Sequence, residues 1–411
     1  MSCENKQLET VQPSTDLASS SKPEISWHRL QTIVYNVHAQ GRLIIVGDVH
    51  GHLPELKLLL QKVSFSKDNG DHLIFVGDLI NKGPDSPGVV QLAMDLGASA
   101  IRGNNEDRVL AARTAIERGD SSRLLDRLKR LALDAEEKTE EETVAPVEVK
   151  DNLKSLSPEH LKPYSSESDF GTAAELSREQ ISWLSWLPLI LRIKPPRGAT
   201  HPPWNAGTLL VVHGGLVPSL PLEQQDPWAV MNMRGLVYPD PEASVTEAIR
   251  ASLLKGVKSR ARRYAAFQDV TDEHVKAELA RLGDVVKNGQ GFSAQHNDGT
   301  IGFPLESRQG EWWIKAWSRW QNAKEDPEKR SIVVYGHDAR AGLQVGTEEE
   351  AAGAVVEGAE RPMEARYTFG LDSGCVYGNC LSAMVIDKKA DGEGLSHSIV
   401  QVDAIKEQKQ Q

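Results

Sequence analysis

Short apolar runs that suit buried strands alternate along this chain with segments of helical periodicity. The runs at 42–46 and 73–76 read RLIIV and LIFV. Apolar residues recur at helical spacing at Leu56, Leu59, Leu60 and Val63 and again at Val89, Leu92, Ala93 and Leu96. Further strands are expected at 98–101, 209–212, 332–335, 368–371 and 381–386, and a further helix at 108–116. This alternation predicts parallel strand pairing and an α/β fold.

Polar residues of the kinds that bind metals follow several of these strands at once. They lie in the segments Gly47-Asp48-Val49-His50-Gly51, Gly77-Asp78-Leu79, Gly103-Asn104-Asn105-Glu106, Val212-His213-Gly214-Gly215 and Tyr335-Gly336-His337. In open α/β sheets, ligands bind just beyond the carboxyl ends of the strands. We therefore expect these side chains, which are far apart in the sequence, to converge on one site.

The donor atoms of this set suit a particular kind of metal. Oxygens of Asp and Asn combined with His nitrogens favour Mn, Fe, Zn or Co over a thiolate-type site. Two Asp, one Asn and three His are enough for two divalent ions if one carboxylate bridges them. Paired metals of this kind are typical of phosphoryl-transfer hydrolases. Each motif alone is compatible with a simple turn, but the ordered set predicts a two-metal centre.

Composition excludes several other classes of protein. The chain has 411 residues and a formal net charge of −11, so it has no overall basic footprint for duplex DNA. Its three cysteines are too few for a disulfide framework. The polar N-terminal segment lacks the apolar region of a signal peptide, and the short apolar stretch from Ile181 to Ile193 contains Pro188. We expect a protein of the cytoplasm or nucleus that contacts no membrane.

The polar and charged stretches indicate how the chain is divided. Residues 1–26 are expected to be a disordered tail, residues 27–402 one domain, and residues 403–411 a polar tail. Three segments interrupt the strand and helix pattern and are interpreted as helical or disordered insertions, at about 134–169, 240–300 and 346–366.

Taken together, the motifs resemble the metallophosphoesterase superfamily, and within it the calcineurin-like, phosphoprotein-phosphatase branch. That branch carries GDxHG, GDxxDRG, GNHE, HGG and GH blocks in the order seen here. The resemblance implies a sandwich of two sheets flanked by helices. It also implies that Asp48 and His50 hold one metal, that Asp78 bridges, and that the second metal is held by Asn104, His213 and His337. Arg234 in the segment MNMRGL resembles the phosphate-binding arginine of the family.

Two departures from the family pattern bear on the chemistry. The DRG of the family is Asn81-Lys82-Gly83 here, and its GNHE has Asn105 in place of the His. Asn cannot act as a general acid at neutral pH, so the acid–base pair of the family is absent. Lys82 keeps a positive charge for phosphate but lacks the planar fork of Arg. We therefore assign catalytic roles to Asp78, Lys82, Arg234 and Asn105, with Lys82 and Arg234 binding substrate.

The segments GDLINKGPDS, RGNNED, HGGLVP, YGHDARAGLQ and GLDSGCVYGNCLSAMVI are similar to those of the ApaH-like phosphatases. Fungal endopolyphosphatase-like proteins and a trypanosomal messenger-RNA decapping enzyme are similar to that group. This resemblance implies attack of a metal-bridging hydroxide on a phosphoanhydride bond. Inorganic polyphosphate, a dinucleoside polyphosphate and the cap of an RNA all qualify as substrates. A serine/threonine protein phosphatase and a weakly catalytic, metal-dependent binding module are the alternatives.

Some features outside these motifs have two interpretations. The tryptophans Trp312, Trp313, Trp317 and Trp320 are expected to pack in the core, with base stacking as the alternative. A basic run, Lys255, Lys258, Arg260, Arg262 and Arg263, is expected to be a solvated helix face or else to attract polyanions. His52 and His296 are expected at the surface, and Cys375 and Cys380 near the last strands.

Overall fold

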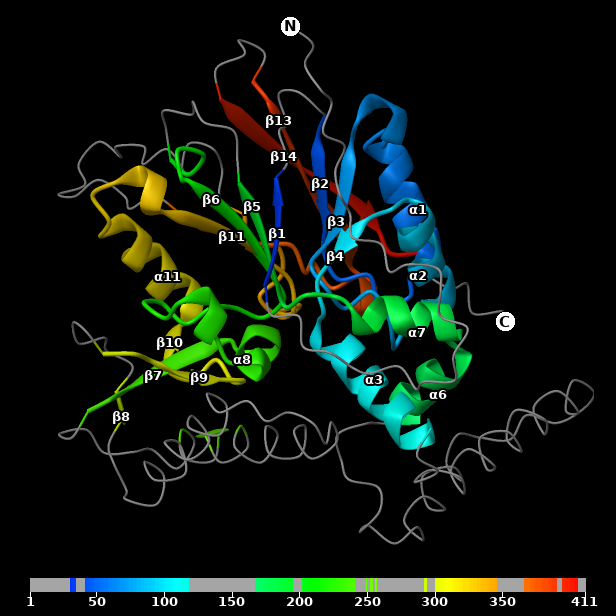
Figure 1. Ribbon diagram of the computed structural model, residues 1–411, viewed down its shortest axis with the longest axis horizontal. Coiled ribbons are helices and arrows are strands. Elements are labelled where there is room, and N and C mark those ends of the chain that lie inside the picture. Colours follow the sequence, from blue (N-terminus) through cyan, green and yellow to red (C-terminus); the bar gives the residue numbers. More distant parts are fainter. Residues whose placement is uncertain are drawn as a thin grey trace, which may run out of the picture.

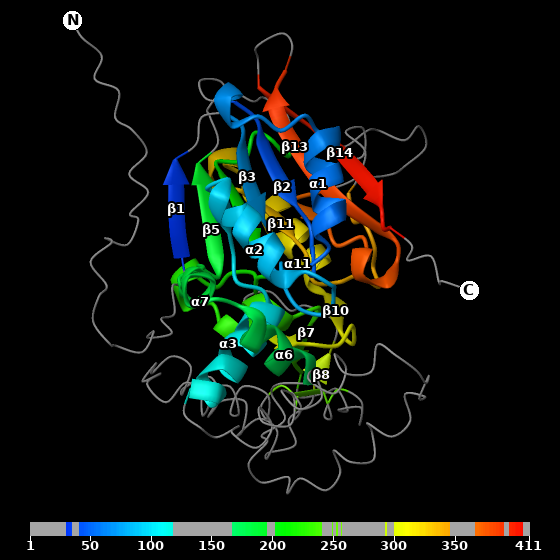
Figure 2. The ribbon, with the colours of Figure 1, turned by 90° about the vertical axis from the view of Figure 1, so that its right-hand side faces the viewer.

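The computed structural model describes residues 30–34, 41–117, 167–194, 202–240, 300–345, 366–389 and 394–405, together with 249, 252–253, 256 and 292–293. Two five-stranded sheets lie face to face, with helices on their outer sides (Figures 1 and 2). The predicted two-sheet α/β sandwich is therefore confirmed. The tail at 1–26, the basic run and His296 lie outside the described residues, as does most of each expected insertion.

One sheet contains the first two ligand-bearing strands. Its strand order is β14 (Leu395–Asp403), β13 (Cys380–Lys388), β2 (Leu43–Val46), β3 (His72–Phe75) and β4 (Ser99–Ala100). Strands β2, β3 and β4 are parallel, as predicted, with Val46 opposite Phe75. Strand β13 is antiparallel to both β2 and β14, which the strand and helix alternation did not predict.

The other sheet contains the two strands that end in histidine. Its order is β1 (Leu30–Val34), β5 (Ile190–Lys194), β6 (Thr208–Val212), β11 (Ser331–Tyr335) and β12 (Thr368–Gly370). Strands β6, β11 and β12 are parallel, and β5 runs antiparallel to β6. A smaller sheet lies beside it, formed by β7 (Gly235–Pro239), β8 (Phe292–Ser293), β9 (Phe303–Leu305) and β10 (Glu311–Trp312).

Alternation of side chains along β2 produces two hydrophobic cores. Leu43 and Ile45 face the other sheet, whereas Ile44 and Val46 face the helices α1 (Leu53–Lys62) and α2 (Ser86–Asp95). A strand buried on both faces must be apolar throughout, which explains the run LIIV. Helix α2 starts where the Asp85 side chain accepts the Gly88 N–H at 2.7 Å.

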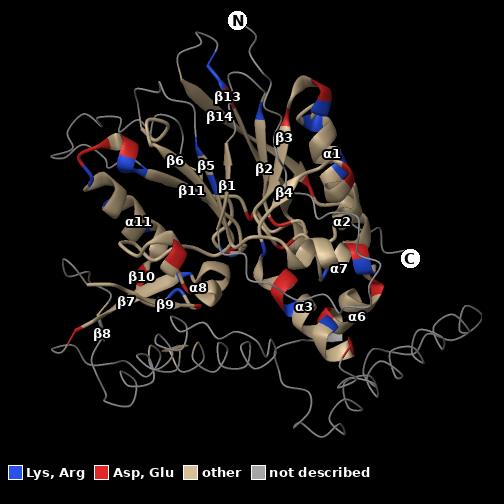
Figure 3. Ribbon diagram, viewed as in Figure 1, with Lys and Arg blue, Asp and Glu red and all other residues tan. Residues whose placement is uncertain are grey.

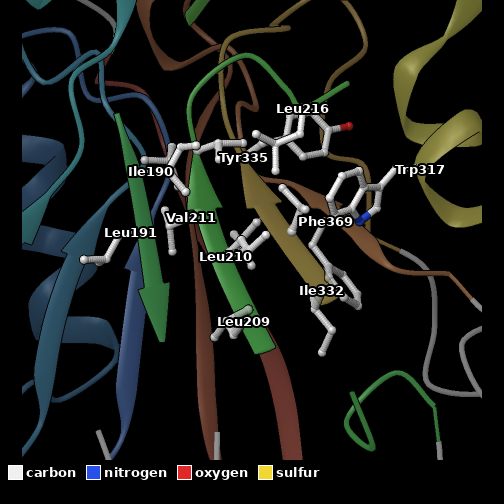
Figure 4. Close-up of a cluster of buried hydrophobic side chains, with 14 of the residues drawn as sticks. Ile190, Leu191, Leu209, Leu210, Val211, Leu216, Trp317, Ile332, Tyr335 and Phe369 are labelled. Atoms are coloured by element: carbon white, nitrogen blue, oxygen red, sulfur yellow. The ribbon is translucent and has the colours of Figure 1, made fainter. Parts of the chain in front are cut away.

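Helix α11 (Trp313–Asn322) covers the outer face of the histidine-bearing sheet. Trp313 packs there against Tyr335, with ring centroids 5.0 Å apart, and Trp317 donates its indole N–H to the carbonyl of Ser331 at 3.1 Å. Figure 4 shows Trp317 among the buried side chains of this core. Trp313 is also buried, so the expected core packing is confirmed for these two tryptophans. Trp320 is partly buried against the same core, with its ring 5.0 Å from that of Trp317.

The remaining described helices surround the ends of the strands. They are α3 (Asn104–Glu117), α6 (Glu167–Glu175), α7 (Arg178–Ser185) and α8 (Pro227–Asn232), with short 3₁₀ turns at Lys67–Asn69, Leu222–Gln224, Pro327–Lys329 and Cys375–Tyr377. None of the described helices combines the length and the apolar character needed to cross a membrane. Helix α6 begins inside the segment expected to be an insertion, and its Asp169 belongs to the site described below.

Candidate metal centre

The predicted ligands come together where the strands of both sheets end. Asp48 and His50 follow β2, Asp78 follows β3, and Asn104 is the first residue of α3. His213 follows β6 and His337 follows β11. Figure 3 shows acidic residues gathered in the loops at this central point. The convergence expected from the strand-end motifs is thus present.

Asp48, His50 and Asp78 form the first half of the centre. One ligand atom from each lies within 4.8 Å of the others, and all three residues are buried. His50 Nε2 is 3.6 Å from Asp78 Oδ2. This is the group that the resemblance assigns to the first metal.

The second half is joined to the first by Asp78. Its Oδ1 lies 3.3 Å from His213 Nε2, on the other side of the carboxylate from His50. Asn104 Oδ1 lies 2.9 Å from His213 Nε2 and 3.1 Å from His337 Nδ1. Because its two oxygens face the two groups of ligands, Asp78 has the position that a bridging carboxylate requires.

The histidines are oriented by backbone carbonyls. Val76 O lies 2.9 Å from His213 Nδ1, and Ile80 O lies 3.3 Å from His50 Nδ1. For His337 the carbonyl is that of Asn232, 3.1 Å from Nε2. Each contact holds one ring nitrogen and leaves the other facing the centre, which is the usual arrangement of metal-binding histidines.

The backbone at the centre adopts conformations that are costly for ordinary residues. His50, Asp78 and His337 have φ angles of 48°, 51° and 73°. Left-handed conformations outside glycine cost about 1–3 kcal/mol each and cluster at functional sites. Two glycines of the motifs let the backbone lie close to the ligand carboxylates. A Cβ on Gly336 would lie 2.0 Å from Asp48 Oδ1, and a Cβ on Gly103 would lie 2.3 Å from Asp78 Oδ1.

Glu106 fixes the turn that carries Asp78. Its Oε2 accepts the N–H groups of Asp78 and Gly103, each at 2.8 Å, and its Oε1 accepts that of Leu79 at 2.8 Å. Burial and the neighbouring Asp78 raise the pKa of Glu106 to about 7. The sequence motif contained Glu106, but no role was predicted for it.

The electrostatics of the centre suit a cation. Burial, together with Asp372 and Asp78, raises the pKa of Asp48. Burial also raises the pKa of Asp372, whose carboxyl group hydrogen bonds to Asp48. Burial lowers the pKa of His50 to about 4, so this imidazole is neutral at pH 7. Burial also lowers the pKa of His337, whereas the pKa of His213 is raised, because the effect of burial is outweighed by the charge of Asp78. Buried carboxyl groups beside the neutral imidazoles of His50 and His337 fit divalent ions, and the oxygen and nitrogen donors match the metals expected.

The two predicted substrate-binding cations lie at the edge of the centre. Lys82 Nζ is 3.4 Å from His50 Nε2. Arg234 donates to the carbonyls of His337 at 3.2 Å and Glu306 at 3.1 Å, and its Nε lies 3.3 Å from Asp338 Oδ1. Arg234 is therefore anchored directly behind one of the ligands.

A second arginine at this edge was not predicted. Arg308 binds Asp338 with Nε at 3.1 Å and Nη2 at 2.5 Å, so one carboxylate holds both Arg308 and Arg234. The Arg308 guanidinium lies over the Trp312 ring, 5.7 Å from its centroid. Nothing in the sequence near Arg308 connects it with the motif of Arg234, because the two meet only through the fold.

The positions of the missing acid–base pair are occupied by two buried amides. Asn105 donates its Nδ2 to Asp78 Oδ2 at 2.5 Å and accepts the Asn81 Nδ2 at 3.1 Å. Asn81 Nδ2 also donates to Asp169 Oδ1 at 2.5 Å. Arg108 holds the other Asp169 oxygen at 2.8 Å. A chain of hydrogen bonds thus runs from Asp78 to Asp169, which lies at the end of a predicted insertion.

The two-sheet sandwich and its strand-end ligands define a metal-dependent phosphoesterase. The model of the calcineurin-like phosphoesterase family matches residues 41–356, and the chain belongs to that family. The resemblance to metallophosphoesterases is confirmed. The roles of individual site residues and the identity of the metals remain predictions.

Several named proteins are similar to parts of the chain. A symmetrical bis(5'-nucleosyl)-tetraphosphatase of Pectobacterium atrosepticum is 43% identical over 97 residues, which is 23% of this chain and 33% of that protein. Serine/threonine-protein phosphatase 1 of Salmonella typhimurium is 41% identical over 71 residues, 17% of this chain and 32% of that protein. The chain thus spans about a third of the length of these curated relatives. A solved putative diadenosine tetraphosphatase is 26% identical, covers 92% of this chain and 99% of its own, and has a TM-score of 0.44.

Proposed function

We propose that this chain hydrolyses phosphoanhydride bonds, in a dinucleoside polyphosphate, in inorganic polyphosphate or in the cap of an RNA. The observation that carries the proposal is the buried amide pair of Asn81 and Asn105. Both side chains are fully buried and engaged in hydrogen bonds, and neither can donate a proton as an acid.

The missing acid matters differently for different leaving groups. A serine side chain leaves as an alkoxide, whose conjugate acid has a pKa comparable with that of water, about 15.7. A phosphate leaving group has a last pKa of only about 6 and needs no proton to depart. General acid catalysis contributes roughly 10²–10⁴-fold. Losing it therefore slows cleavage of phosphoserine far more than cleavage of an anhydride.

The residues around the centre suit a substrate with several phosphates. Divalent ions held by the six ligands would supply Lewis-acid polarisation of phosphoryl oxygens and generate the nucleophile at neutral pH. Lys82 lies beside His50, whereas Arg234 and Arg308 lie together on Asp338. Three cations at the edge of one centre can contact more than one phosphate of an extended anion and stabilise charge that develops during transfer. The tetraphosphatases that resemble parts of this chain support the dinucleoside polyphosphate within this class.

Two other functions make different predictions. A serine/threonine protein phosphatase, the function named for one relative, would prefer phosphopeptides. A binding module would bind these anions with little turnover. The ligand set argues against the module, because all six predicted ligands converge.

The experiment is a substrate panel. The purified full-length chain is treated with a chelator, supplied with Mn, Co or Zn, and incubated with polyphosphate, diadenosine tetraphosphate, capped RNA and a phosphoserine peptide. We expect at least one phosphoanhydride substrate to turn over faster than the peptide. A preference for the peptide would favour the protein phosphatase, and no turnover with any metal would favour the binding module.

A further inference from the structure

A second group of potential ligands lies beside the centre but outside it. His52 precedes helix α1, Glu55 lies in the first turn of that helix, and Cys375 begins the 3₁₀ turn Cys375–Tyr377 after β12. One ligand atom from each lies within 4.8 Å of the others. His52 Nδ1 is 3.4 Å from Glu55 Oε1. Three residues from two distant parts of the chain therefore meet at one point.

Glu55 is not an ordinary member of a hydrophobic core. It is 3% exposed, and its oxygen Oε1 accepts the backbone N–H of Ile405 at 2.9 Å. Its side-chain neighbour is the His52 imidazole, and the described residues give it no Lys or Arg partner. A buried carboxylate needs a compensating cation or several hydrogen bonds. A metal ion between Glu55, His52 and Cys375 would supply that charge.

The donor set also indicates which metal would bind. Nitrogen, oxygen and sulfur donors together suit zinc and similar borderline ions, whereas Mg, Ca and Mn prefer sites built from oxygen. The His52 side chain is 18% exposed, which gives an ion a route from solvent. Three protein ligands would leave a fourth position of a tetrahedral ion open.

We propose that His52, Glu55 and Cys375 form a binding site for a zinc-class divalent ion, separate from the two-metal centre. The site would connect two loops of that centre. His52 is two residues beyond His50, and Cys375 is three residues beyond Asp372. Its occupation is expected to raise the thermal midpoint of the protein. This inference does not depend on the proposed function.

Cobalt provides a test because a thiolate ligand gives Co²⁺ an intense sulfur-to-metal charge-transfer band in the near ultraviolet. The six ligands of the two-metal centre contain no sulfur, so that centre cannot produce the band, and the cysteine variants identify which thiol does. Chelator-treated full-length protein is titrated with Co²⁺. We expect the band in the wild type, in Cys380→Ser and in Asp78→Asn, and its loss in Cys375→Ser. Cys380→Ser is the matched control, because Cys380 is the other cysteine that the structure describes.

A band that survives in Cys375→Ser, or its absence from the wild type at excess Co²⁺, would overturn the proposal. A band in Asp78→Asn together with lost activity would separate this site from the proposed function. If Cys375→Ser fails to fold, zinc X-ray absorption on the wild type alone still tests the proposal. Zinc X-ray absorption should show a sulfur neighbour at about 2.3 Å, and a spectrum with nitrogen and oxygen neighbours alone would contradict the site.

Discussion

Replacing Asn81 by Asp should destabilise this protein, although Asp is the residue in the corresponding motif of the phosphoprotein-phosphatase branch that the sequence resembles. The reason is Asp169, whose Oδ1 lies 2.5 Å from Asn81 Nδ2. In Asn81→Asp, the amide donor becomes a second carboxylate oxygen beside the first. Both residues are completely buried, so solvent cannot screen the repulsion.

Two physical limits set the magnitude. Two full charges 2.5 Å apart repel by about 6–7 kcal/mol at an effective dielectric constant of about 20. The pair can avoid this by protonating one carboxyl group. Starting from an ordinary pKa of about 3.9, that costs about 4 kcal/mol at pH 7 and about 1.5 kcal/mol at pH 5. Protonation costs less than the repulsion, so one carboxyl group is expected to be protonated. The free energy of unfolding should therefore fall by about 4 kcal/mol at pH 7, and by less at lower pH.

The assay is urea unfolding of the chelator-treated protein at pH 7 and pH 5. It compares the wild type, Asn81→Asp, Asp169→Asn and the double variant. Asp169→Asn removes the repulsion, and Arg108, whose side chain is 30% exposed, is then partly solvated. We expect the double variant to recover most of the stability that Asn81→Asp loses at pH 7. Additive losses, or a loss by Asn81→Asp that does not depend on pH, would refute the reasoning.

Other predictions concern the centre itself. Asp78→Asn should lose both ions and nearly all activity, because Asp78 faces both groups of ligands. If elemental analysis found two metal ions in the variant and its turnover were normal, the bridging role of Asp78 would be contradicted. Lys82→Ala should lower turnover while the metal content stays intact. The control is Lys57→Ala, which removes an exposed lysine on helix α1. A loss of metal in Lys82→Ala that matches its loss of turnover would make Lys82 a structural residue. Glu106→Gln should weaken metal binding, measured by calorimetric titration, although Glu106 is not a predicted ligand. The reason is that the Gln amide cannot accept all the N–H groups that the Glu106 carboxylate accepts from the turn carrying Asp78. An unchanged metal affinity would contradict this role of Glu106. In the metal-free protein, the pKa of Glu106 rises from 4.5 to about 7 on folding, so its contribution to stability is complete below about 4.5 and falls as pH rises through about 7. The free energy of unfolding is measured at pH 4.5 and pH 8 for the wild type and for Glu106→Gln. Between these pH values the wild type should lose about 3 kcal/mol more than the variant. Equal losses in the two proteins would contradict the raised pKa of Glu106.

Much of this centre was accessible from the sequence because its ligands are local features of strand ends. An apolar run fixes a buried strand, and the residue that follows must emerge at the sheet edge, so Asp48, Asp78 and His213 could be placed together without a structure. The strands β1 and β14 were missed because they lie at sheet edges and are partly exposed, which weakens the apolar signal.

Residues that reach the centre from elsewhere could not be predicted in this way. Asp169 lies on a helix after a charged, serine-rich stretch, and its contact with Asn81 exists only after α6 packs on α3. Arg308 meets Arg234 through Asp338, which is distant from both in the sequence. No local pattern encodes such pairings, because they depend on how the layers pack.

The central claim is that this centre transfers phosphoryl groups without a general acid. Its most direct test is the dependence of kcat/KM on the leaving group, measured with fully metal-loaded wild type on aryl and alkyl phosphomonoesters and on diadenosine tetraphosphate. Without a general acid, kcat/KM should fall steeply as the pKa of the leaving group rises. The kcat/KM for diadenosine tetraphosphate should exceed that for alkyl phosphomonoesters by at least the roughly 10²–10⁴-fold that acid catalysis provides. A dependence that is nearly flat, with alkyl esters cleaved as fast as the anhydride, would contradict the account.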